Sequence, residues 1–157
     1  MSSKGFYEDH RGPGGALRSF PPKDAIDGDV ATYWSVPNRL RAREFAIWQY
    51  SFAEAKVLEH LSIRFKYGEN VEKVTIHGKV DCSNELFSVR EDNRLTRKLR
   101  RIHSRSIDEA VDFTADELIR FKVEKRKMRA YKCYAIRMET WTEAYVGIKE
   151  ISFYEGQ

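Results

Sequence analysis

A period-two alternation of apolar and polar side chains recurs along most of this chain, and no other feature constrains its fold as strongly. The alternation is clearest in residues 45–50 (FAIWQY) and 61–66 (LSIRFK). Successive side chains of a β-strand point to opposite faces, so this pattern predicts strands that are each buried on one face. Further stretches of the same kind cover residues 74–77, 121–124, 136–139, 146–148 and 151–153.

The spacing of these stretches indicates the fold class. They are short, and turn sequences such as residues 67–70 (YGEN) separate them. This arrangement is typical of an all-β antiparallel sandwich or barrel and not of alternating strands and helices. Two segments are candidates for short helices: residues 52–58, and residues 114–117 (TADE), which have the form of a capping box. A chance spacing of Thr and Glu in a loop explains the second segment equally well.

Length and composition favour one folded domain. The chain has 157 residues, of which 41% are hydrophobic and 13% aromatic, which is enough to bury a core without disulfides or metals. Residues 1–15 are polar and end in a Pro-Gly-Gly run, so we expect a flexible N-terminal segment there. The sandwich domain is expected to cover residues 16–157.

Cysteines and apolar runs bear on the compartment. No run approaches the ~18 apolar residues of a membrane span, and the N-terminus lacks the apolar segment of a signal peptide. The sequence has no Asn-x-Ser/Thr glycosylation site. Cys82 and Cys133 form no recognisable disulfide or metal-binding pattern, so we expect both to be reduced. The compartment stays open, with a preference for the interior of the cell.

Three segments, in the right order, resemble the discoidin family, which includes coagulation-factor C domains and many bacterial carbohydrate-binding modules. Residues 25–35 (AIDGDVATYWS) resemble its opening signature, A-x-D-G-(D/N)-x-x-T-x-W, while residues 133–138 (CYAIRM) and 146–154 (VGIKEISFY) resemble its last two strands. The resemblance implies a jelly-roll β-sandwich of the galactose-binding-domain-like type with about eight strands. The chain departs from extracellular members by lacking a terminal cysteine pair and by having a basic middle region.

The opening signature has two interpretations. Asp27-Gly28-Asp29 has the composition of a tight turn, in which the Asp side chains bond to local amides. Carboxylate, hydroxyl and carbonyl oxygens are also the ligands that calcium prefers. The resemblance implies a structural Ca²⁺ held by Ala25 (through its carbonyl), Asp27, Asp29, Thr32 and Glu150. We expect Trp34 to pack in the core below this turn.

The resemblance also implies that a ligand meets loops at one end of the sandwich. Three arginines in five residues follow the signature, and their planar forks suit anions or sugar hydroxyls. A second loop, between the last two strands, carries two aromatic residues suited to a sugar face or an apolar partner. A solvated basic loop and a hairpin covering the core edge are the alternatives. The candidate ligand-binding residues are Arg39, Arg41, Arg43, Tyr67, His77, Trp141 and Tyr145.

Cations gather in two segments. Thirteen of the 28 Lys and Arg residues lie in residues 94–105 and 120–132. Such clusters favour phosphate-bearing or acidic partners, but the first segment lacks the aromatic residues that stack on bases, and a solvated charge run explains it as well. In the second segment we expect Phe121 and Val123 to point inward and Lys122 outward.

No spacing typical of a nucleophile with its base, of a phosphate-binding loop or of a catalytic metal is present. We therefore predict a non-catalytic binding module with no membrane span and, following the resemblance, a lectin-like role in carbohydrate recognition. The first alternative is an intracellular protein-interaction or scaffold domain that uses the same loops. The second is nucleic-acid or acidic-lipid binding through residues 94–105, which we rank below a glycan or protein partner.

Overall fold

The computed structural model of the protein describes residues 6–7, 34–35, 39–41, 44–80, 93–97, 99–101, 109–111 and 118–156. Within these residues the secondary structure consists of β-strands and two single-turn 3-10 helices, and this confirms the predicted all-β class. The strands are β1 (Phe6–Tyr7), β2 (Trp34–Ser35), β3 (Phe45–Lys66), β4 (Val71–Lys79), β5 (Leu99–Arg101), β6 (Glu109–Val111), β7 (Ile119–Lys122), β8 (Ala130–Thr140) and β9 (Gly147–Glu155). The 3-10 helices are η4 (Gly68–Asn70) and η6 (Lys125–Lys127).

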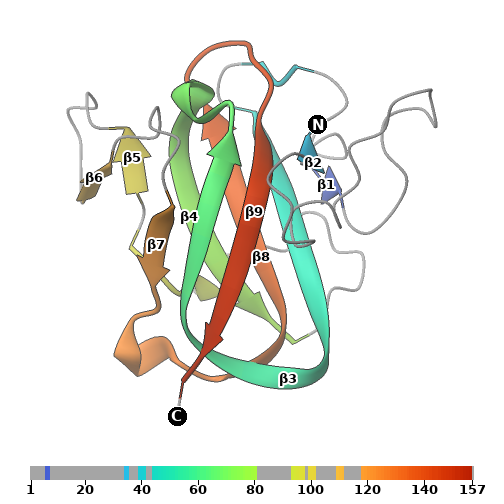
Figure 1. Ribbon diagram of the computed structural model, residues 1–157, viewed down its shortest axis with the longest axis vertical. Coiled ribbons are helices and arrows are strands. Elements are labelled where there is room, and N and C mark those ends of the chain that lie inside the picture. The colour runs from blue at the N-terminus through green and yellow to red at the C-terminus, as the bar shows by residue number, and fades with distance from the viewer. Residues whose placement is uncertain are drawn as a thin grey trace.

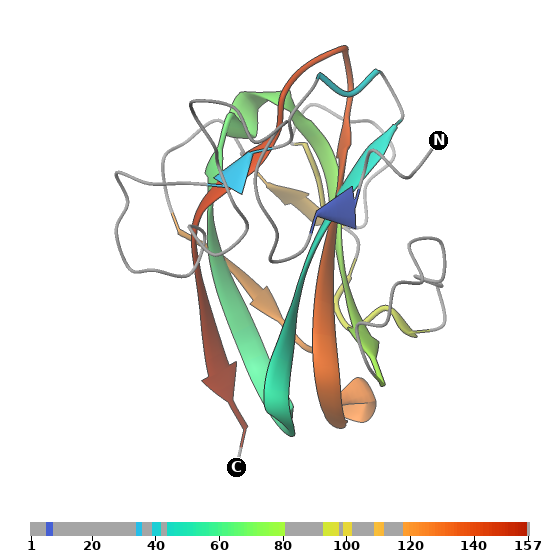
Figure 2. The ribbon, with the colours of Figure 1, turned by 90° about the vertical axis from the view of Figure 1, so that its right-hand side faces the viewer.

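Strand β3 links two layers of a jelly-roll sandwich (Figures 1 and 2). Its first half pairs with β8, which also pairs with β4, whereas its second half lies between β9 and β7. These pairings are all antiparallel. The full order is β2-β9-β3-β8-β4-β5-β6, and β1 adds Phe6 and Tyr7 in parallel beside the first half of β3.

The core lies between the two layers, where the alternation predicted it. Leu61 and Ile63 of β3 are completely buried, and the Trp48 ring lies 6.4 Å, centroid to centroid, from the Phe153 ring of β9. Phe121 on β7 and Val123 directly after it point inward while Lys122 is exposed, as expected. Apolar burial of this extent is the main stabilising term of the fold.

Residues 52–58 form no helix, so that expectation is wrong. They belong to β3 and form the bend through which the strand passes from one layer to the other, with residues 53–55 exposed. The pairing with β8 shifts register between Ser51 and Lys56. The bend is fixed from inside because the Tyr134 hydroxyl donates a hydrogen bond to the Lys56 carbonyl, and burial raises the pKa of Tyr134. The second candidate helix, residues 114–117, and the domain boundary at residue 16 lie outside the described residues.

Cys133 also departs from expectation, because it is disulfide-bonded and not a thiol. It is fully buried in β8. The only other cysteine of the sequence is Cys82, which lies outside the described residues. Disulfides persist in oxidising compartments, so the cysteines no longer favour the interior of the cell. Among the described residues, no helix has the length and apolar character needed to cross a membrane.

Candidate functional site

Three loop segments that are far apart in the sequence meet at one end of the sandwich, opposite the C-terminus (Figure 1). They are residues 39–41, residues 67–70 and the β8–β9 loop, residues 141–146. Leu40 and Ala144 exchange two backbone hydrogen bonds of 2.8 and 2.9 Å, and both side chains are buried. These bonds fix the first segment against the β8–β9 loop. We call this assembly the loop end.

The turn after β3 supplies the second part of the loop end. Tyr67 has a left-handed backbone (φ 63°, ψ 39°), and the Asn70 amide donates to the Tyr67 carbonyl at 2.9 Å. This confirms the turn predicted from the sequence YGEN. The Asn70 side-chain amide donates to the Tyr145 carbonyl at 3.0 Å, and the Trp141 indole N–H donates to the Glu69 carbonyl at 3.1 Å. The turn therefore holds both ends of the β8–β9 loop.

Aromatic side chains remain accessible on this frame. Trp141 is 49% exposed and Tyr145 is 39% exposed. The Tyr67 and Tyr145 rings lie 6.2 Å apart between centroids, and the Arg39 guanidinium carbon is 5.8 Å from the Tyr145 centroid. Rings of this kind can cover the C–H face of a sugar, and a nearby guanidinium donates to its hydroxyl groups.

Of the other two predicted arginines, only Arg41 belongs to the described residues. The Arg41 side chain is exposed, while its backbone is fixed on both sides: its amide donates to Glu44 Oε1 at 2.7 Å, and its carbonyl accepts from Thr140 Oγ1 at 3.3 Å. Arg43 lies outside the described residues. The loop end thus brings together Arg39, Tyr67, Trp141 and Tyr145, with Arg41 on the same backbone segment as Arg39.

His77 does not belong to this site, and its expected position near an exposed loop was wrong. It is completely buried in β4, where Nδ1 lies 2.9 Å from Asn93 Oδ1 and Nε2 lies 3.1 Å from Thr75 Oγ1. From Val74 to Lys79 every residue of β4 is buried. Both faces of this stretch are covered, so its alternation could not tell an inward from an outward position.

The proposed calcium ligands are only partly covered by the structure. Ala25, Asp27, Asp29 and Thr32 lie outside the described residues, and Glu150 lies on β9 opposite Arg64. The described residues contain no group of three or more His, Cys, Asp or Glu side chains arranged to hold a metal. One pairing bears on the ligand set: Trp34 is registered antiparallel with Ile148, two residues before Glu150. The end of the signature therefore lies beside the start of β9.

The sequence alone did not single out the residues that position the loop end. Asn70 and Glu69 were recognised only as parts of a turn, yet one donates to Tyr145 and the other accepts from Trp141. Leu40 sits between two arginines and had no predicted role. Its pairing with Ala144 joins residues more than a hundred positions apart, and no local pattern encodes such a contact.

No protein-family model and no curated protein sequence matches the chain. Solved structures do match. The F5/8 type C domain of a Bacteroides fragilis protein has a TM-score of 0.60 at 18% identity, covering 88% of this chain and 82% of that domain. CBM32-3 of a Clostridium perfringens family 31 glycoside hydrolase has a TM-score of 0.65 at 12% identity, covering 99% and 94%.

A third solved structure, chitosan-binding module 1 from a Paenibacillus chitosanase/glucanase, has a TM-score of 0.58 at 12% identity and covers 86% of this chain and 85% of that module. At these identities the likeness concerns the fold. The three structures share the β-sandwich that the opening signature and the last two strands predicted. The chain is a β-sandwich domain with the discoidin, galactose-binding-like jelly-roll fold.

Proposed function

We propose that this chain is a non-catalytic module that binds carbohydrate through its loop end. The observation that carries the proposal is the convergence of Arg39, Tyr67, Trp141 and Tyr145 on a frame of interloop hydrogen bonds. In this arrangement Trp141 and Tyr145 cover an apolar sugar face, and Arg39 donates to hydroxyl or ring oxygens.

The chemistry of the loop end favours a sugar over a broad protein interface. Its exposed aromatic rings are few and lie beside a cation, whereas a stable protein interface requires a wider apolar patch with a polar rim. The other large exposed apolar residues that the structure describes, Val80, Leu118 and Tyr154, lie outside the loop end. Carbohydrate-binding modules of the same fold support the proposal, among them the chitosan-binding module.

A glycan array probed at low and at high salt tests this function. We expect selective binding to neutral saccharides that survives in about 0.5 M NaCl, because stacking and neutral hydrogen bonds are little affected by ionic screening. Isothermal titration with the best saccharide then gives the affinity and the stoichiometry. Absence of any binding to neutral glycans would contradict the proposal and favour a protein partner.

We further propose a structural Ca²⁺ ion held by Asp27, Asp29, Thr32, the Ala25 carbonyl and Glu150. The set offers hard oxygen donors, as calcium requires, and the pairing of β2 with β9 supports a site shared between the signature and Glu150. When bound, the ion would join the two segments and stabilise the fold. No part of the proposed sugar contact depends on it.

Calcium should raise the melting temperature of the EDTA-treated protein. At a Ca²⁺ concentration of 100 times Kd, binding stabilises the folded state by about 2.7 kcal/mol, or about 5 °C or more for a chain of this length. Asp27→Ala should abolish the shift, while Asp24→Ala, a carboxylate outside the proposed ligand set, should retain it. A melting temperature that calcium leaves unchanged, measured by differential scanning calorimetry, would contradict the site.

A further inference from the structure

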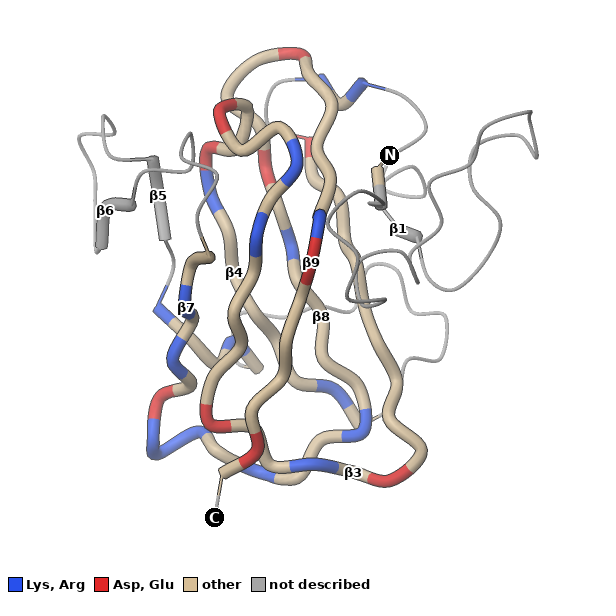
Figure 3. The backbone as a smooth tube through the Cα atoms, viewed as in Figure 1, with Lys and Arg blue, Asp and Glu red and all other residues tan. Residues whose placement is uncertain are grey.

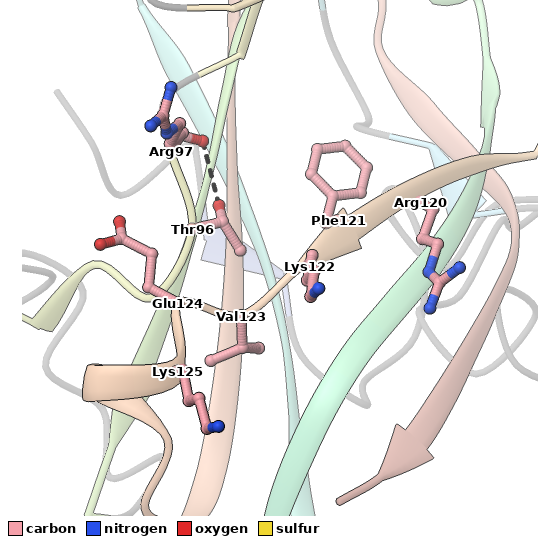
Figure 4. A pocket seen from close by; sticks show the side chains of 8 residues that line it. All are labelled: Thr96, Arg97, Arg120, Phe121, Lys122, Val123, Glu124 and Lys125. Carbon is pink, nitrogen blue, oxygen red and sulfur yellow. Dashed lines mark hydrogen bonds between the residues drawn. The ribbon is translucent and has the colours of Figure 1, made fainter.

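A concave surface lies away from the loop end, between residues 96–97 on one side and β7 with the residues that follow it on the other. It has a volume of about 420 Å³, which is within the range of small-ligand sites. The lining residues are Thr96, Arg97, Arg120, Phe121, Lys122, Val123, Glu124 and Lys125 (Figure 4). We call it the β7 pocket.

Hydrogen bonds hold the walls of the β7 pocket together. The Glu124 amide donates to the Leu95 carbonyl at 2.8 Å, and the Val123 amide donates to the Glu59 carbonyl at 3.0 Å. Lys127 Nζ donates to the Arg94 carbonyl at 2.8 Å. Thr96, Phe121 and Val123 are buried, and Figure 4 shows Thr96 and Val123 between the side chains of Arg97 and Lys125. The pocket therefore has a fixed base and charged side chains around it.

The charge of the pocket is strongly positive. Arg97, Arg120, Lys122 and Lys125 are all exposed, and none of them forms an ion pair with a carboxylate among the residues that the structure describes. Glu124 is the one acidic residue of the described lining, and it is already engaged by Arg126, whose Nη2 lies 3.3 Å from Glu124 Oε1. Figure 3 shows the same excess of cations along β7 and η6. Four accessible cations therefore line the pocket, and the carboxylate of Glu124 is already paired with Arg126.

The pKa of the His60 imidazole responds to these cations. It is covered by Tyr154 of β9, with ring centroids 4.2 Å apart, and its Nδ1 lies 3.5 Å from Arg120 Nη2 and 3.8 Å from Glu59 Oε1. Burial lowers the pKa of His60, and Arg120 and then Lys122 lower it further, against the opposing effect of Glu59. An anion bound between the two cations would raise this pKa, so His60 is a built-in probe of occupancy.

The shape and lining of the β7 pocket restrict the ligand class. Among its described lining residues the only aromatic side chain, Phe121, is 1% exposed, so these residues offer no platform for stacked bases. The exposed residues of this described lining are all charged, so they supply no apolar wedge for a membrane. Sulfate and carboxylate groups fit guanidinium and ammonium donors spread around a small concave surface.

We propose that the β7 pocket is a second binding site, distinct from the loop end, for sulfate- or carboxylate-bearing oligosaccharides. Arg120 and Lys122 contact oxyanion groups from β7, and Arg97 and Lys125 contact them from the two ends of the pocket. An acidic glycan and a neutral one would thus engage different parts of the same module.

Isothermal titration of the full chain with a heparin-derived tetrasaccharide and with tetragalacturonate tests the proposal. Neutral chitotetraose, inorganic sulfate, inorganic phosphate and a short single-stranded oligonucleotide serve as comparison probes. We expect one acidic tetrasaccharide to bind, and the R120Q/K122Q variant to bind it at least about tenfold more weakly. R129Q/K132Q removes the same charge from exposed residues outside the pocket and should retain at least half of the wild-type affinity.

His60 provides an independent readout by NMR. Its pKa should rise when the acidic tetrasaccharide is added to the wild-type protein, and it should already be higher in R120Q/K122Q without ligand. Equal weakening in both double variants would overturn the pocket in favour of a diffuse basic surface. Tighter binding of the oligonucleotide, or of inorganic phosphate, would overturn the saccharide assignment.

The two sites can be separated. Trp141→Ala should leave binding of the acidic tetrasaccharide unchanged, and R120Q/K122Q should leave neutral-glycan binding unchanged. If neutral glycans fail to bind anywhere, the function proposed for the loop end fails while the β7 pocket is still tested by the acidic probes. Loss of acidic binding in Trp141→Ala would instead show that the loop end binds both ligands and would overturn the second site.

Discussion

Replacing Trp141 by alanine should weaken the binding of a neutral saccharide about 10- to 100-fold. The Trp141 ring is 49% exposed, so a sugar can bury a large part of its face. Losing that burial costs about 1.5 to 3 kcal/mol, and each 1.4 kcal/mol corresponds to a factor of ten in Kd. The variant should still fold, although it loses the buried half of the ring and the indole hydrogen bond to the Glu69 carbonyl.

The matched control for this prediction is Tyr154→Ala. Tyr154 is 42% exposed, similar to Trp141, but it lies on β9 near the C-terminus and stacks on His60. Titration calorimetry should show unchanged neutral-saccharide affinity for Tyr154→Ala. Trp141→Phe keeps an aromatic face but loses the indole hydrogen bond to Glu69, so its affinity should lie between wild type and Trp141→Ala. Equal affinities in wild type and Trp141→Ala would exclude the loop end as the sugar site.

Replacing Trp48 by alanine should have the largest effect on stability, about 3 to 5 kcal/mol of unfolding free energy. Trp48 is 1% exposed and lies where the first half of β3 faces β9. Its ring is stacked 6.2 Å from Tyr50 and 6.4 Å from Phe153, measured between centroids. Truncation would leave a cavity between two layers that cannot close, because β3 is paired on both of its halves.

Urea unfolding followed by fluorescence or circular dichroism measures this loss. Trp141→Ala removes a tryptophan of the same size that is 49% exposed, and the lost indole hydrogen bond to Glu69 should cost about 0.5 to 1.5 kcal/mol. If Trp48→Ala were as stable as Trp141→Ala, the placement of Trp48 in a core between the two layers would be contradicted. Failure of Trp48→Ala to fold also agrees with the prediction. In that case Trp48→Phe, which keeps a ring, should fold with a smaller loss of unfolding free energy.

The contrast between the two tryptophans indicates how function is built on this fold. The interior of the sandwich supplies stability through the rings between β3 and β9, while the loop end presents the exposed rings. Hydrogen bonds of Leu40, Asn70 and Glu69 hold these loops in place. Each of these bonds involves at least one backbone group. A sugar would therefore meet a surface that is largely preorganised, which reduces the entropy lost on binding.

Local sequence patterns were enough to predict the all-β class, the buried face of several strands and the turn at Tyr67. They were sufficient because a period of two is a local property: Leu61, Ile63 and Phe121 are apolar at positions that must face a core, and each is buried. The resemblance in the opening signature and the last two strands pointed to the fold that the solved structures confirm, and it also directed attention to Arg39, Trp141 and Tyr145.

The burial of His77, the extended conformation of residues 52–58 and the loop contacts follow from the tertiary structure alone. They depend on partners that are distant in sequence. His77 is buried since both faces of β4 are covered, and residues 52–58 stay extended since β3 is hydrogen-bonded in both layers. The disulfide of Cys133, the joining of Leu40 to Ala144 and the approach of Thr96 to β7 likewise bring separate segments together. Local alternation specifies which face of a strand is apolar, but the burial of the opposite face and the meeting of loops depend on how the whole chain packs.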